Sequence, residues 1–222
     1  MGCELSGELG NRDHILRQRL TYFHAYYSKT LAEQRTGPEV LKAVFRADNE
    51  PERTDEASEQ ERAVWRRNYS ILSKFALVPG ANTEGIDTAA LSRWIGRLRE
   101  LAVAGHRGAI SDEYIGHILA HSAPGNDGVW PSVPVRAQIE SLRSDHLEQG
   151  IRIERFNMRG VHSRAVYAGG DEERALAKRY SDFGAVMTEW PRTQGLLLSI
   201  ARDWEADAAQ QDERAEQRKM RV

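Results

Sequence analysis

The stretch DTAALSRWIGRLREL, residues 87–101, carries the pattern that decides the fold class. Its apolar residues recur at intervals of three and four, which places them on one side of a helix. They are Leu91, Trp94, Ile95, Leu98 and Leu101. Asp87 precedes them, and its side-chain oxygen is suited to accept from the free N–H groups of a first helical turn. The stretch therefore predicts an amphipathic helix with one buried face.

The same spacing recurs along the chain and predicts about eight helices joined by short turns. The other predicted helices lie near residues 13–33, 39–45, 58–76, 111–119, 133–148, 171–187 and 196–208. Turn-forming residues separate them, most clearly at residues 79–87. We therefore predict a mainly all-α fold, as an antiparallel bundle or a short solenoid-like array.

The predicted helices also suggest how the chain is organised. Residues 1–12 lack a helical pattern and are predicted to be a flexible N-terminus. Residues 13–208 are predicted to form one helical domain, which a connection near residues 48–56 can subdivide, because this stretch is acidic and contains Pro51. Residues 209–222 are polar on every turn and predict a helical extension or a tail.

The composition is that of a globular protein rather than a disordered one. Of the 222 residues, 40% are hydrophobic and 29% are charged, and the chain is long enough to bury a core without disulfides. A net charge of -2 argues against a general attraction to nucleic acids or anionic membranes. It does not exclude a local basic patch.

Cysteine use and hydropathy point to the cytoplasm. Cys3 is the only cysteine, so an intrachain disulfide is excluded, and no apolar run approaches the roughly 20 residues of a membrane-spanning helix. Gly2 and Ser6 fit the N-myristoylation pattern, and Cys3 beside them is a palmitoylation candidate. Because this pattern is short, an ordinary unstructured N-terminus is the favoured interpretation.

Residues 150–170 break the helical pattern and are rich in arginine. The alternation at Ile151-Arg152-Ile153 fits either a small β-hairpin or an ordered loop. Arginine interleaved with aromatic residues can bind phosphates and stack on bases, or contact an acidic protein surface. Alternatively, the arginines pair with carboxylates of neighbouring helices. The predicted binding residues, including one from a nearby loop, are Arg152, Arg155, Phe156, Arg159, His162, Arg164 and Trp130.

His117 and His121 are the candidate metal ligands. Their spacing of four places both rings on one side of the helix predicted there, which suits zinc. Asp112 and Glu113, one turn back, are candidates for a further carboxylate ligand. Ile118 occupies the position where the helical zinc-protease motif requires Glu. The alternative is that both histidines pack at the edge of the core and cap a helix end.

Motifs for other chemistry are missing from the sequence. There is no P-loop and no Gly-x-Ser-x-Gly nucleophile turn. Gly169-Gly170 precedes a predicted helix, but the acidic run 171–173 would repel a phosphate there. We therefore predict no catalytic residue and no cofactor.

Several stretches resemble helical C-terminal regions of large, poorly characterised bacterial multidomain proteins, some of which look like parts of defence systems. The stretches are residues 38–46, 79–87, 121–131, 156–162 and 169–177. The resemblance implies a helical accessory or interaction region and implies no activity.

Three functions follow as hypotheses. The first is a non-enzymatic protein-interaction or accessory domain of a bacterial multiprotein or multidomain system, because the helical pattern is complete and no reactive group assembles in the sequence. The second is a nucleic-acid-binding accessory domain that uses the Arg152–Arg164 segment. The third is a metal-dependent enzyme centred on His117 and His121.

Overall fold

The structure is a computed structural model that describes residues 37–51, 56–160 and 169–220, with side chains from Leu41 onward. Three of the predictions fall outside the described residues. These are the helix at residues 13–33, the lipidation pattern at Gly2 and Cys3, and the part of the arginine-rich segment that contains His162 and Arg164.

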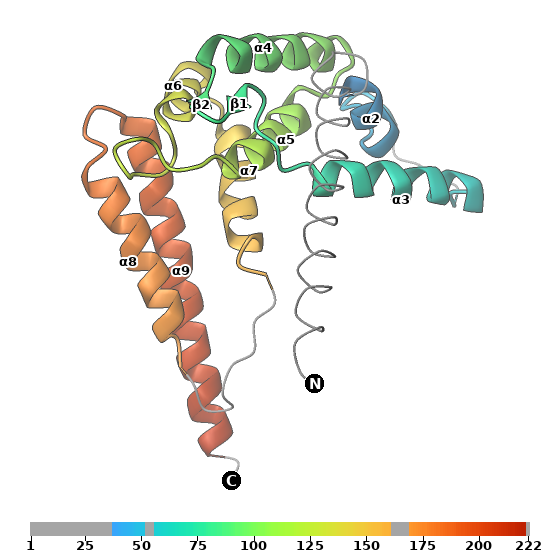
Figure 1. Cartoon of the computed structure of the whole chain (residues 1–222). Helices are drawn as coiled ribbons and strands as arrows, with labels where there is room; N and C mark the ends of the chain where they lie inside the picture. Colours follow the sequence, from blue (N-terminus) through green and yellow to red (C-terminus); the bar gives the residue numbers. More distant parts are fainter. Residues whose placement is uncertain (1–36, 52–55, 161–168, 221–222) are drawn as a thin grey trace, which may run out of the picture.

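Helices dominate the described residues, which confirms a mainly all-α fold (Figure 1). They are α2 (Gly37–Val44), α3 (Glu59–Lys74), α4 (Thr88–Ala104), α5 (Gly108–Ala120), α6 (Val133–Leu142), α7 (Asp145–Asn157), α8 (Asp171–Ala185) and α9 (Pro191–Lys219). One small hairpin joins α3 to α4. Its antiparallel strands are β1 (Ala81–Asn82) and β2 (Gly85–Ile86), within the predicted turn cluster.

Side-chain caps are present at the starts of α3 and α4, and the one at Asp87 is predicted from the sequence. Ser58 and Glu61 form a reciprocal capping box at the start of α3. The carboxylate of Asp87 accepts from the backbone N–H groups of Ala89 and Ala90 at 2.8 and 2.9 Å. These bonds satisfy amide groups that would otherwise lack a partner in the first turn.

The predicted helix at residues 133–148 is divided into α6 and α7. Arg143 adopts a left-handed conformation with φ 48°, which ends α6. Ser144 then caps α7 by accepting from Leu147 N–H at 3.3 Å. Apolar spacing alone does not show such a break, because the two helices continue the same pattern of buried residues.

Residues 150–157 belong to α7, so the prediction of a small β-hairpin or an ordered loop is wrong for this part of the segment. Leu147 and Ile151 are buried at helical spacing, whereas Ile153 is 42% exposed. In a strand, Ile151 and Ile153 would share one face. The alternation of Ile151, Arg152 and Ile153 therefore comes from one helix that presents different sides to the core and to solvent.

The helices surround one hydrophobic core. In Figure 1, α5 and α7 cross near the centre, α4 lies along one edge, and α8 and α9 form a long antiparallel pair at one side with α2 and α3 at the other. The buried side chains of the central helices include Ile115, Ile118, Leu119, Leu147 and Ile151. Among the described helices, none has the length and apolarity needed to cross a membrane.

Candidate metal centre

Two glycines bring α5 and α7 into backbone contact. A Cβ atom on Gly116 would lie 2.1 Å from the carbonyl oxygen of Leu147, and one on Gly150 would lie 1.9 Å from the carbonyl oxygen of Glu113. Both distances are far inside van der Waals contact, so no larger residue fits at either crossing point. The close approach places the last turns of α7 beside the last turns of α5.

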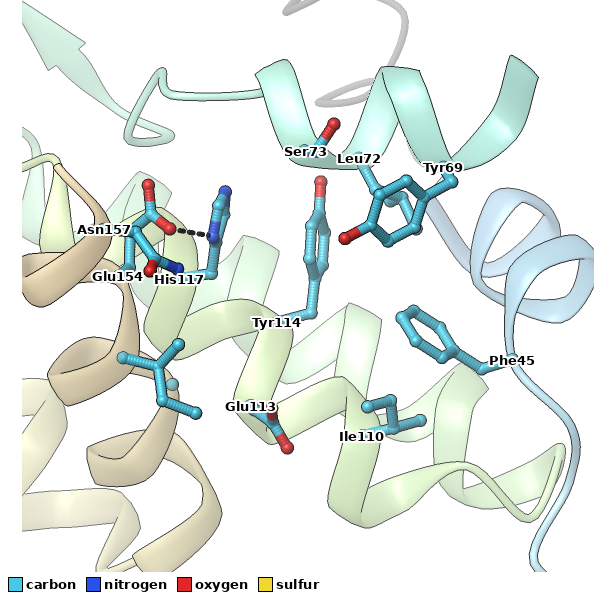
Figure 2. A pocket seen from close by; sticks show the side chains of 12 residues that line it. Phe45, Tyr69, Leu72, Ser73, Ile110, Glu113, Tyr114, His117, Glu154 and Asn157 are labelled. Atoms are coloured by element: carbon cyan, nitrogen blue, oxygen red, sulfur yellow. Dashed lines mark ion pairs between the residues drawn. The ribbon is translucent and has the colours of Figure 1, made fainter. Parts of the chain in front are cut away.

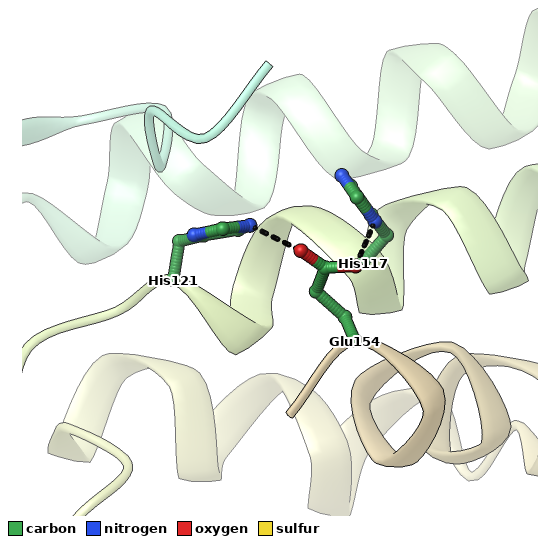
Figure 3. A group of neighbouring side chains, drawn as sticks. All are labelled: His117, His121 and Glu154. Atoms are coloured by element: carbon green, nitrogen blue, oxygen red, sulfur yellow. Dashed lines mark hydrogen bonds and ion pairs between the residues drawn. The ribbon is translucent and has the colours of Figure 1, made fainter. Parts of the chain in front are cut away.

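Three side chains meet beyond this crossing, as Figure 3 shows. His117 lies in the last turn of α5, His121 is the residue that caps the C-terminal end of that helix, and Glu154 lies one turn after Gly150 on α7. One carboxylate oxygen of Glu154 lies 2.9 Å from Nδ1 of His117. The other lies 2.9 Å from Nε2 of His121. The carboxylate thus bridges the two imidazoles across the helix interface.

The side chains of the cluster are mostly buried but keep some contact with solvent. The side chains of His117, His121 and Glu154 are 20%, 18% and 13% exposed. Burial lowers the pKa of His117, and the nearby Glu154 carboxylate opposes this effect only in part. A neutral His117 imidazole is therefore favoured near neutral pH, and this is the form that binds metal ions.

The geometry suits a divalent transition metal. The three ligand atoms lie within 4.8 Å of one another, and within the described parts of the chain this is the one such group of three. Ligands on a tetrahedral zinc ion are about 3.4 Å apart when each bond is about 2.1 Å. Side-chain rotamer changes that move the ligand atoms by about an ångström would therefore bring them to the spacing that a zinc ion requires. Two histidines and one carboxylate leave a coordination position open for water or substrate.

A cavity of about 470 Å³ lies against this cluster (Figure 2). His117 and Glu154 form part of its wall. His121 lines a second cavity of about 630 Å³ instead, which lies along the β1–β2 hairpin and the loop at Asp127. The cluster therefore borders two cavities, one lined by His117 and Glu154 and the other by His121.

Tyr114 extends the cluster along α5. Its ring stacks on that of His117, with centroids 5.9 Å apart and planes 11° apart. The Tyr114 hydroxyl and the outer nitrogen of His117, Nε2, are both buried, and neither has a hydrogen-bond partner among the described residues. Burial raises the pKa of Tyr114, so its phenol stays protonated. We call Tyr114, His117, His121 and Glu154 the histidine cluster.

The carboxylate that joins the histidines is not one of the two that the sequence suggested. Asp112 pairs with Arg99 at 2.8 and 3.1 Å and accepts from the Ser144 hydroxyl at 2.6 Å. Glu113 lines the cavity but is not part of the group of three. Glu154 stood out in the sequence only as the single acid of an arginine-rich segment. No local spacing in the sequence connects Glu154 to the histidines, because their contact depends on the crossing of α5 and α7.

The described arginines of the predicted binding segment have partners within the chain. Arg152 pairs with Asp203 at 2.7 Å. Arg155 donates to the Tyr180 hydroxyl at 2.7 Å, and its guanidinium lies 4.5 Å from the centre of the Trp130 ring. These contacts match the alternative in which the arginines pair inside the fold.

Arg159 has the largest set of acidic partners. It bonds to Glu172 at 2.9 Å and to the fully buried Glu173, and Asp207 lies 3.8 Å away. Its guanidinium also lies 5.3 Å from the centre of the Trp204 ring. We call Arg155, Arg159 and these partners the arginine cluster.

The two aromatic residues predicted to bind a partner differ in exposure. Trp130 is only 2% exposed and donates from Nε1 to the carbonyl oxygen of Ser122 at 3.0 Å, so it is a core residue and not a contact surface. Phe156 is 44% exposed and stacks on Trp204 with ring centres 4.5 Å apart. Sequence alone does not separate these cases, since both residues lie next to helix ends.

Gly169-Gly170 has a packing role in the structure. A Cβ atom on Gly170 would lie 2.3 Å from the carbonyl oxygen of Ala208, and its N–H donates to Asp212 at 2.8 Å. The glycine therefore lets the start of α8 approach the backbone of α9.

The comparisons with known proteins found no relative. The chain matches no protein-family model, no curated protein and no solved structure. The resemblance to C-terminal regions of large bacterial proteins therefore stays a prediction, and the functional argument rests on the residues themselves.

Proposed function

We propose that this chain binds a divalent transition-metal ion, with zinc as the best fit, through His117, His121 and Glu154. The supporting observation is the bridging carboxylate, whose two oxygens each lie 2.9 Å from a histidine nitrogen. Imidazole and carboxylate ligands suit zinc and related ions. The partly buried setting also protects the ion from competition by solvent.

The ligand set favours a reactive centre over a purely structural one. Structural zinc sites are generally closed by four protein ligands, whereas sites with three keep a position for water. A metal ion at this place would border the cavity that His117 and Glu154 line. Activation of a metal-bound water for hydrolysis is the chemistry that such a centre would supply. This makes a metal-dependent enzyme the leading proposal.

Metal content and affinity test this proposal directly. Protein purified without an affinity tag is stripped with chelator and titrated with zinc by isothermal calorimetry at pH 7.5. We expect one ion per chain in the native protein. We expect at least about a hundredfold weaker binding for His121→Asn, because a metal ligand is lost. His146→Asn is the matched control, since His146 is exposed on α7 outside the cluster. Equal binding by both variants, or no stoichiometric binding at all, would reject the site.

A protein-interaction role is the second candidate, and one observation favours it. Trp65 and Tyr69 on α3 stack with ring centres 4.9 Å apart and are 44% and 47% exposed. Val64 beside them is 50% exposed. Exposed aromatic residues are enriched at protein interfaces. Such a surface fits an accessory domain of a larger bacterial system.

Light scattering with and without candidate partners from neighbouring genes tests this role. We expect a complex that Trp65→Ala and Tyr69→Ala together abolish. The nucleic-acid hypothesis has less support, because Arg152, Arg155 and Arg159 each contact groups inside the fold.

A further inference from the structure

The cavity beside the histidine cluster has polar groups that no neighbour among residues 37–51, 56–160 and 169–220 satisfies. Figure 2 shows the Tyr114 hydroxyl pointing toward α3, and the outer nitrogen of the His117 ring beside it points the same way. Both residues line the cavity, and both atoms are buried without a partner among the described residues. Tyr114 is only 8% exposed. Buried polar atoms are normally paired, so two adjacent exceptions in one cavity wall point to a ligand.

The rest of the cavity favours a flat apolar molecule. Phe45, Leu72, Ile110 and Ile153 contribute apolar side chains from four different segments, and Tyr69 adds a second aromatic ring. A volume of about 470 Å³ lies in the usual range of small-molecule sites, which is roughly 300 to 1,000 Å³. Aromatic walls of this kind stack well on planar rings.

The charges of the lining residues exclude one class of ligand. Glu113 and Glu154 are both in the wall, and the described residues that line it include neither Lys nor Arg. In the metal-free protein an anion would be repelled by the two carboxylates, and a metal ion bound at Glu154 would in turn repel a cation. An uncharged ligand therefore fits best.

A metal ion would determine which hydrogen bond His117 offers to the cavity. In the metal-free neutral ring, Nδ1 donates to Glu154, so Nε2 carries only a lone pair. A metal ion bound at Nδ1 takes that position, and the ring proton then resides on Nε2. Metal binding thus changes the group that faces the cavity from an acceptor to a donor, and a carbonyl oxygen is its natural partner.

We propose that this cavity binds a small, uncharged aromatic molecule with a carbonyl group, and that a metal ion on His117, His121 and Glu154 strengthens its binding. The dependence on metal rests on the function proposed above. The carbonyl oxygen accepts from Nε2 of His117 or from the Tyr114 hydroxyl, and the aromatic ring lies among the apolar walls. By thermodynamic linkage, the same ligand strengthens metal binding by an equal factor.

Acetophenone and ethylbenzene form a matched pair of probes, because they share shape and differ in the carbonyl oxygen. The full chain, labelled with ¹³C at the isoleucine δ1 methyl groups, is titrated at pH 8 with chelator and then with one equivalent of zinc. We expect acetophenone to shift the methyl signals of Ile110 and Ile153, with about five- to tenfold higher affinity when zinc is present. Ethylbenzene should bind more weakly and show no dependence on zinc.

Two substitutions connect the effect to the proposed groups. Tyr114→Phe should lower the affinity for acetophenone and leave that for ethylbenzene nearly unchanged, which also shows that the cavity is still folded. His121→Asn should remove the dependence on zinc, because His121 is a metal ligand that does not line this cavity.

The outcomes separate the two proposals. If zinc binds but acetophenone shifts neither methyl signal, the cavity site is wrong and the metal centre stands. If acetophenone binds but zinc does not, the metal centre and its linkage are wrong and the cavity site alone is supported. Equal affinity for acetophenone and ethylbenzene in the presence of zinc would overturn the role of the carbonyl group.

Discussion

The histidine cluster and the arginine cluster meet at the C-terminal end of α7, which contributes Glu154 to one and Arg155 to the other, and they pair their polar groups differently. Arg159 meets two glutamates and has an aspartate nearby, and Arg155 meets a hydroxyl and an aromatic ring. In the histidine cluster, by contrast, one carboxylate contacts two imidazoles, and His117 Nε2 and Tyr114 Oη have no partner within the described part of the chain. The ion pairs of the arginine cluster stabilise the fold, whereas two adjacent unpaired polar atoms in one cavity wall indicate a site for a ligand. Trp204 Nε1, beside Arg159, is also buried without a partner among the described residues, but Trp204 is not in the lining of that cavity.

Gly150→Ala should have the largest effect, because it changes the helix crossing that creates the histidine cluster. The added methyl group would overlap the carbonyl oxygen of Glu113, so α7 must move away from α5. We expect a loss of about 3 kcal/mol in the free energy of unfolding, measured with urea, together with loss of zinc binding.

Gly96→Ala is the matched control for this substitution. Gly96 lies within α4, and a Cβ atom there would meet nothing within 4 Å. Alanine loses less backbone conformational entropy on folding than glycine does. Gly96→Ala should therefore stabilise the protein by about 0.5 to 1 kcal/mol and leave zinc binding intact. If Gly150→Ala behaves like Gly96→Ala, the close crossing is not what holds the cluster together.

Removing one carboxylate from each cluster should affect different properties, namely stability in the arginine cluster and zinc binding in the histidine cluster. Glu173→Gln breaks a buried ion pair with Arg159 and should cost about 3 kcal/mol of stability without changing zinc affinity. Glu154→Gln should cost about 1 kcal/mol, because it removes hydrogen bonds to imidazoles rather than a fixed cation, and should weaken zinc binding at least about a hundredfold.

Urea unfolding and zinc calorimetry on both variants give the answer, with Glu100→Gln as an exposed control on α4. The distinction between the clusters fails if Glu173→Gln weakens zinc binding as much as Glu154→Gln does.

The sequence predicts local features of this fold far better than contacts between helices. Helical spacing and capping side chains locate most helices, since these signals act within a few residues. The spacing of His117 and His121 likewise predicts two candidate metal ligands on one face. Their third partner depends on Gly116 and Gly150, whose effect arises only when two helices cross. Glycine in a helix carries no such information until its neighbour in space is known.

The arginine-rich segment shows the same limit. A run of arginines is compatible with a binding surface and with internal ion pairs. The carboxylates that pair with Arg159 belong to Glu173 and Asp207 on α8 and α9, and the local sequence does not show that they lie nearby. The apparent strand alternation at residues 151–153 is likewise resolved only by packing, which buries Ile151 and exposes Ile153.

The smallest expected effect is the pH dependence of the metal-free histidine cluster. Burial lowers the pKa of His117 in the folded protein relative to the unfolded chain, where it is near 6.5. Between the lowered pKa and about 6.5, the unfolded chain binds more protons than the folded protein, so stability rises with pH in this window.

We therefore expect the free energy of unfolding to fall as pH is reduced below about 6.5, and this slope to be smaller in His117→Asn. His146→Asn, an exposed histidine variant, should keep the native slope. Urea unfolding at pH 5.5, 6.5 and 7.5 measures all three proteins. An unchanged slope in His117→Asn would mean that the Glu154 carboxylate offsets the burial of the imidazole in full, so that the carboxylate stabilises the charged imidazole as the acidic partners of Arg159 stabilise its guanidinium.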